Sequence, residues 1–302
     1  MHRMKITAGI GGITHYKKIV EAGADECFAG FVPLDWLEKY TNITPLNRRE
    51  VILQDMQLST IAEMRRLAAM VRDCGVPVAL TFNSPVYRPD QYPIISNMLD
   101  ALGEAGFRDV IIADFGLLFH LKSANYPGRI HLSGEAGLFN MEAMQLFSGM
   151  NIARWIFPRK VAPSEMGECI RQLPGCEYEA FALNELCQYS GAHCMSLHCD
   201  EMSHACCIPY LPVGHDCENA PEVVQNYPPD SFGAGGCGLC ALPAMQSAGI
   251  THLKIVGRGA NIENMARDVR IMRIASEMLK RDETNLLTLL PGKKCSGMCY
   301  YL

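Results

Sequence analysis

Short apolar runs alternate with amphipathic stretches along most of the chain. A run of four to six apolar residues between turn residues is typical of a buried parallel strand. Such runs cover residues 5–10, 26–31, 77–82, 109–113, 129–132, 153–157, 178–183 and 252–256. The pattern therefore predicts eight strands.

Helical stretches separate most of these runs. Predicted helices cover residues 16–22, 59–74, 91–105, 141–147, 163–172, 239–248 and 261–280. Gly75 and Gly106 follow two of them directly, as glycine often does at a helix C-terminus. Ser59 is the predicted N-cap of the second helix, with Glu63 in its first turn. The polar segment 33–58 is predicted to be a loop.

Strands that are each followed by a helix predict a parallel (β/α)₈ barrel of the TIM type. The 302 residues and the 49% hydrophobic content suit one such domain over residues 1–302. The alternative is an open doubly wound sheet. Its dinucleotide fingerprint is missing, because Gly9-Ile10-Gly11-Gly12 does not match G-x-G-x-x-G, and the sequence has no P-loop.

Charge and hydropathy exclude several classes of protein. The formal net charge is -5 and no dense Lys/Arg run occurs, so we expect no DNA binding. No apolar stretch approaches the ~20 residues of a membrane span. The N-terminus has no signal-peptide core, so a cytoplasmic location is expected.

Fourteen cysteines are unusual for such a protein, and many lie in the segment 187–240 between the seventh and eighth strands. Clustered cysteines in a reducing compartment more often bind metal than form disulfides. An iron–sulfur cluster and a zinc site both use four thiolates, so the sequence leaves iron and zinc open. The roles of Cys237, Cys295 and Cys299 are also left open.

Active sites in barrels of this type lie at the carboxyl ends of the strands. Arg159 and Arg258 follow two strands there and would suit a dianionic substrate, since guanidinium groups pair with carboxylates. Glu135 and Asp114 are the candidate acid/base residues, and Asn184 is a candidate substrate-binding residue.

The sequence resembles the collagenase-like peptidase U32 family. The resemblance is carried by Glu179-Ala-Phe181 and Leu186-Cys187, by Ser190-Gly191 and Cys194-Met-Ser196, and by Lys254-Ile-Val-Gly-Arg258. The chain departs from the family at Leu183-Asn184, where His-Gly is common, and at Val256, where Glu is common. The sequence has no HExxH or GxSxG motif of a peptidase.

The resemblance implies a [4Fe-4S] cluster, with zinc as the alternative. Its ligands would be Cys187, Cys194, Cys206 or the adjacent Cys207, and Cys240. Relatives support oxygen-independent hydroxylation of ubiquinone precursors or of RNA bases, with prephenate as oxygen donor in the RNA-modifying members. The length is similar to that of the short, paired quinone-pathway proteins, which implies a second U32-type subunit as partner.

The leading hypothesis is therefore an iron–sulfur enzyme that hydroxylates, or otherwise modifies by redox chemistry, a small aromatic molecule without oxygen. The alternatives are a cluster-bearing accessory subunit of a hetero-oligomeric hydroxylase, an enzyme that hydroxylates RNA bases, and a protease as the family name says.

Overall fold

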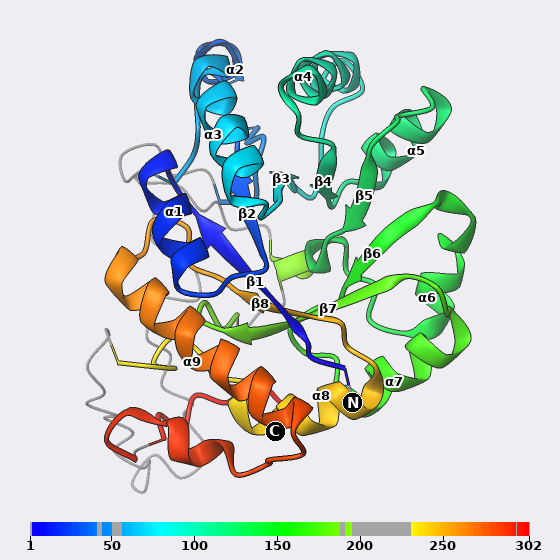
Figure 1. Ribbon diagram of the computed structural model, residues 1–302. Coiled ribbons are helices and arrows are strands. Elements are labelled where there is room, and N and C mark those ends of the chain that lie inside the picture. The colour runs from blue at the N-terminus through cyan, green and yellow to red at the C-terminus, as the bar shows by residue number, and fades with distance from the viewer. Residues whose placement is uncertain are drawn as a thin grey trace, which may run out of the picture.

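The computed structural model describes residues 2–40, 44–49, 56–187, 191–194, 231–293 and 295–301. Its centre is a closed parallel barrel whose strands follow one another in chain order, with β8 paired to β1 (Figure 1). The strands are β1 (Lys5–Ile10), β2 (Glu26–Gly30), β3 (Val78–Phe82), β4 (Asp109–Ile112), β5 (Arg129–Leu132), β6 (Ile152–Ile156), β7 (Glu177–Leu183) and β8 (His252–Ile255). The predicted TIM-type barrel is confirmed. The open doubly wound sheet is excluded, because an open sheet would leave two edge strands unpaired.

Helices surround the barrel and bury its outer face (Figure 1). They are α1 (Ile13–Glu21), α2 (Leu34–Tyr40), α3 (Ile61–Cys74), α4 (Tyr92–Ala105), α5 (Phe115–Ser123), α6 (Met141–Gln145), α7 (Pro163–Gln172), α8 (Leu242–Ala248) and α9 (Ile262–Lys280). Short 3₁₀ turns include η2 (Gly134–Ala136) after β5 and η7 (Leu239–Ala241) before α8. In the described part of the chain, no helix is long and apolar enough to cross a bilayer.

The start of α3 differs from the prediction by one residue. Thr60, not Ser59, is the N-cap: its hydroxyl accepts from the Glu63 backbone N–H, and the Glu63 side chain accepts from the Thr60 N–H. Ser59 lies one residue earlier and donates to the same carboxylate through its backbone N–H. Thr60 takes the cap because the Glu63 N–H is three residues beyond it, which is the spacing of a capping box.

Alternate residues of each strand point into the barrel, and they form two layers of opposite character. The lower layer is charged and has Arg154 at its centre. The Arg154 guanidinium pairs with Glu26 at 2.7 Å, Glu177 at 2.8 Å and Glu179 at 2.9 Å, and its side chain is 1% exposed. His252 lies 3.2 Å from Glu26 in the same network. This barrel therefore has a base of shared ion pairs where branched apolar side chains are usual.

The upper layer is apolar and lies toward the carboxyl ends of the strands. Its members form a cluster separate from the outer core: Phe28, Ala79, Ile111, Ile156, Phe181, Val256 and Tyr300. The first six come from strands or strand ends around the barrel, and Tyr300 comes from the C-terminal segment. This layer lies between the charged base and the mouth of the barrel.

Candidate functional site

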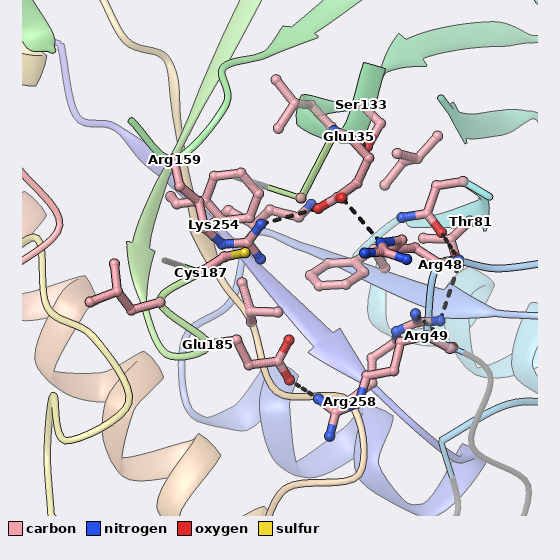
Figure 2. Close-up of a pocket in the computed structure, with 18 of the residues that line it drawn as sticks. Arg48, Arg49, Thr81, Ser133, Glu135, Arg159, Glu185, Cys187, Lys254 and Arg258 are labelled. Carbon is pink, nitrogen blue, oxygen red and sulfur yellow. Dashed lines mark hydrogen bonds and ion pairs between the residues drawn. The ribbon is translucent and has the colours of Figure 1, made fainter. Parts of the chain in front are cut away.

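A cavity of about 380 Å³ opens at the carboxyl ends of the strands (Figure 2). Its apolar wall is the upper interior layer, including Phe28, Ile156 and Phe181. Its polar lining comes mainly from the segments that follow the strands. The cavity lies where TIM-type barrels carry their active sites.

Positive charge dominates the lining. Five described residues carry a positive charge and two carry a carboxylate: Arg48, Arg49, Arg159, Lys254 and Arg258 against Glu135 and Glu185. The described lining therefore has three more positive charges than negative ones. A concave site of this sign favours an anionic ligand, because its apolar walls strengthen the field inside it.

Glu135 stands between two of the arginines. One carboxylate oxygen lies 3.1 Å from Arg159 Nη1, and the other lies 3.5 Å from Arg48 Nε. The turn η2 sets its position, since the Ser133 hydroxyl accepts from the Glu135 backbone N–H at 3.2 Å. All three charged side chains are 10% exposed. The carboxylate of Glu135 is thus bound by two guanidinium groups at once.

Arg258 and Arg49 form a second group of arginines on the wall. Arg258 Nη1 donates to Thr81 Oγ1 at 3.0 Å and to Gln57 Oε1 at 3.2 Å. Arg49 pairs with Glu185. These contacts fix Arg258 at the mouth and keep Arg49 and Glu185 together (Figure 2).

Two of the cations lie on aromatic rings inside the cavity. Arg159 Cζ is 3.9 Å from the centroid of the Phe181 ring, and Lys254 Nζ is 3.9 Å from that of Phe28. Stacking of this kind favours the charged forms and holds them in place. Lys254 also donates to Glu179 Oε1 at 2.6 Å, which links the cavity to the charged base of the barrel.

Three of the site residues predicted from the sequence come together here. Arg159, Arg258 and Glu135 all line the cavity. Sequence reasoning missed Arg48, Arg49 and Lys254. Arg48 and Arg49 lie in the segment predicted to be a loop, where nothing in the sequence except their charge indicates a site residue. Lys254 could have been found, because it is a charged residue within an otherwise apolar run.

The other two predicted residues have different surroundings. Asp114 caps α5: its carboxylate accepts from the Leu117 N–H at 2.5 Å and from the Tyr87 N–H at 3.1 Å. Asn184 donates from its side-chain amide to Asp268 at 3.1 Å and to the Val256 carbonyl at 3.3 Å. Neither is among the residues that line the cavity. Both side chains therefore hold neighbouring segments in place.

The predicted metal ligands are only partly described. Cys187 lines the cavity. The carbonyl oxygen of Cys194 accepts from Arg48 Nη2 at 2.7 Å, which brings this cysteine's backbone beside the same wall. Cys206 and Cys207 lie outside the described residues. Within the described ranges, no three His, Cys, Asp or Glu side chains are gathered in a metal-binding group.

Cys240 lies in η7, just before α8, beside other thiols. Burial raises the pKa of the Cys237 thiol to about 11, and the neighbouring Cys240, Cys295 and Cys299 add to this rise. Cys237 and Cys299 face each other in a backbone bridge, with the Cys237 N–H donating to the Met298 carbonyl at 2.7 Å. The C-terminal cysteines left open by the sequence are thus neighbours of Cys240.

The C-terminal segment closes one side of the cavity. Met298 lines it, and the Tyr301 hydroxyl donates to the Phe181 carbonyl of β7 at 2.8 Å. These contacts place the last described residues against the strand that leads to Cys187.

Comparison with known proteins agrees with the resemblance seen in the sequence. The sequence profile of peptidase family U32 matches residues 11–291. The chain belongs to peptidase family U32. No histidine is among the described residues that line the cavity.

Two curated relatives are similar at low identity. The tRNA hydroxylation protein P1 of Bacillus subtilis (strain 168) is 23% identical over 293 residues, which are 94% of this chain and 65% of that protein. The collagenase of Porphyromonas gingivalis (strain ATCC BAA-308 / W83) is 26% identical over 145 residues, which are 48% of this chain and 30% of that protein. The chain thus spans less than two thirds of either relative.

Solved structures support the fold. The native KDPGal structure matches 93% of this U32 chain and 98% of its own, with a TM-score of 0.50 and 9% identity. Identity this low shows the shared barrel alone.

Proposed function

We propose that this U32 chain is an iron–sulfur enzyme that hydroxylates, or modifies by related redox chemistry, a small anionic aromatic molecule without oxygen. One observation carries the proposal: a cationic cavity with aromatic walls opens beside Cys187. The similarity to a tRNA hydroxylation protein supports hydroxylation or a related modification.

The size and lining of the cavity suit one small molecule. Ligand pockets commonly measure ~300–1,000 Å³, and this one is at the lower end at about 380 Å³. An aromatic ring would lie against Phe28 and Phe181, and carboxylates would meet Arg159 and Arg258. A dicarboxylate such as prephenate, the oxygen donor that the resemblance implies, has this character. Glu135 would be displaced by a ligand carboxylate or would exchange a proton with the ligand.

Thiolates near the cavity would hold the cluster. Cys187, Cys194 and Cys206 are the first three proposed ligands, with Cys240 as the fourth, and the soft thiolate donors suit iron–sulfur as well as zinc. A bound [4Fe-4S] cluster would supply one-electron transfer next to the substrate. The arginines and Glu135 would bind and orient the substrate, and the apolar layer would exclude water from beneath it.

The test is the metal content of protein purified without air. We expect about four irons per chain, with matching sulfide and a broad visible absorption band. Cys187→Ser should lose most of this iron. Cys74→Ser is the matched control, because Cys74 is an exposed thiol at the end of α3. A colourless protein with one zinc would overturn the redox proposal, and recovery of a second barrel subunit would favour the accessory-subunit alternative.

RNA-base hydroxylation is the second candidate, favoured by the tRNA relative and by Arg48 and Arg49 on the wall. Binding of tRNA that weakens steeply with salt would support it, since RNA affinity depends on released counterions. Binding of small aromatic carboxylates but not of tRNA would reject it.

A further inference from the structure

Lys254 differs from the other cations of the cavity in chemistry and in place. It is the amine in a lining whose other described cations are guanidinium groups. It lies on β8 inside the barrel and is 6% exposed, whereas Arg258 follows the same strand at the mouth. An amine can act as a nucleophile in its neutral form, and a guanidinium cannot do so at ordinary pH.

The pKa of Lys254 is lower than that of a lysine on the surface. Burial lowers its pKa; the ion pair with Glu179 opposes this, and the nearby Arg154 and Arg159 lower it further. Glu179 is shared between two cations, because its second oxygen pairs with Arg154 at 2.9 Å. The amine thus lies where it can give its proton to Glu179 Oε1 at 2.6 Å and face the cavity.

We propose that Lys254 Nζ forms a Schiff base with the carbonyl carbon of a 2-oxo acid whose carboxylate is held by the arginines of the cavity. The proposal rests on the cavity being the substrate site and names a substrate class for it. Arg159 lies beside Lys254 in Figure 2, so a carboxylate adjacent to the carbonyl would meet a guanidinium while the carbonyl carbon meets the amine.

The step balances without an oxidant or a reductant. Lys254 transfers a proton to Glu179, and the neutral amine adds to the carbonyl carbon to give a carbinolamine. The carbinolamine hydroxyl takes up a proton and leaves as water, so the carbon–nitrogen double bond replaces the carbon–oxygen bond. The product is an iminium ion. Both protons of the released water come from the Lys254 ammonium group: one passes through Glu179, and the other moves from nitrogen to oxygen when the carbinolamine forms.

The charge at this position is the same before and after the reaction. The iminium nitrogen carries the positive charge that the ammonium group carried, so Glu179 keeps its ion pair and the Phe28 ring keeps its cation. Burial of Glu179 therefore does not oppose the reaction, although an unpaired carboxylate there would be costly. The iminium also withdraws electrons from the carbon next to it, which would activate that carbon for further chemistry.

Reductive trapping tests this directly. The whole chain is incubated with pyruvate or with phenylpyruvate, sodium borohydride is added, and the protein mass and the modified peptide are determined. We expect one reduced adduct per chain on the peptide that contains Lys254. Lys254→Arg should show no adduct, while it keeps the charge beside Glu179 and so preserves the fold. Lys122→Arg is the control, because Lys122 is exposed on α5 and its loss should leave trapping unchanged.

Two outcomes would overturn the proposal. One is equal labelling of the wild type and Lys254→Arg; the other is no labelling by either oxo acid of wild-type protein whose folded state is confirmed by circular dichroism. Trapping requires no cluster, and the iron content is measured separately. A failed trap therefore leaves the iron–sulfur proposal standing, and an iron-free protein leaves the Schiff base standing.

Discussion

The Arg258 guanidinium occupies the space beside the Cα of Gly30. A Cβ built on Gly30 would collide with Arg258 Nη1 and with the Gln57 carboxamide that binds it. Gly30 is the last residue of β2, so this space lies at the carboxyl end of that strand. The backbone there needs no unusual torsion angle; the requirement is for room.

Gly30→Ala should therefore displace Arg258 and weaken carboxylate binding while the barrel stays folded. A lost hydrogen bond to a charged group contributes roughly 1.5–3 kcal/mol, which corresponds to about a ten- to hundred-fold weaker affinity. Calorimetric titration with an aromatic dicarboxylate measures it. Gly103→Ala is the control, since a Cβ there meets nothing within 4 Å. Unchanged affinity in Gly30→Ala would show that Arg258 does not bind the ligand.

The catalytic role predicted for Asp114 can be separated from its role as a helix cap. Asp114→Ala removes the acceptor for the Leu117 and Tyr87 N–H groups, so we expect a loss of about 1–2 kcal/mol in the free energy of unfolding. Ligand affinity and turnover should change little. Asn140→Ala, which removes the cap of α6, should give a loss of similar size. If Asp114→Ala instead abolished turnover while losing only this much stability, the result would support the predicted acid/base role of Asp114.

Much of the fold follows from the sequence, and the misses have physical causes. The strands were found because buried parallel strands are continuous apolar runs. Helix α5 was missed because Phe115–Ser123 is apolar around most of its circumference, so it lacks an amphipathic period. Its cap, Asp114, was read as a site residue because a carboxylate directly after a strand has the same sequence pattern in both roles.

The site was less predictable than the barrel. Arg159 and Arg258 were found from their places after β6 and β8. Arg48 and Arg49 reach the cavity from a long connection, and no local pattern tells where such a connection lies. A position after a strand does not say which way a side chain turns, and that of Asn184 turns to Asp268.

Arg154 is expected to be the most sensitive charged residue of the barrel base. Arg154→Met leaves three carboxylates near one another without their shared cation, and removal of one partner from buried ion pairs costs about 3–5 kcal/mol. Urea unfolding measures the loss. Arg129→Met is the control: its side chain is 48% exposed although it contacts Glu177 and Asp109, so about 1 kcal/mol or less is expected. Equal losses would contradict a special role for the buried guanidinium.

His131 should make the protein sensitive to moderate acid. Burial, with the Arg154 charge, lowers the pKa of this histidine from 6.5 to about 3. Between these values the unfolded chain binds a proton that the folded chain does not, so stability falls as pH falls. The slope is about 1.4 kcal/mol per pH unit for one proton. The free energy of unfolding of His131→Gln should fall less steeply between pH 6 and pH 4 than that of the wild type. Urea unfolding at each pH measures both. Parallel pH profiles would show that His131 is protonated in the folded state.

The charged base has a consequence for how this barrel can diverge. Arg154 shares one charge among carboxylates of β2 and β7, so a change at any one of these positions alters the charge balance of the whole network. We therefore expect Arg154 and the carboxylates that pair with it to be substituted together in related sequences, and seldom one at a time. The arginines at the mouth are divided between two smaller groups, one around Glu135 and one that contains Arg49 and Arg258, so each group can change without the other. Mutational drift would thus alter which anion is accepted long before it alters the barrel beneath.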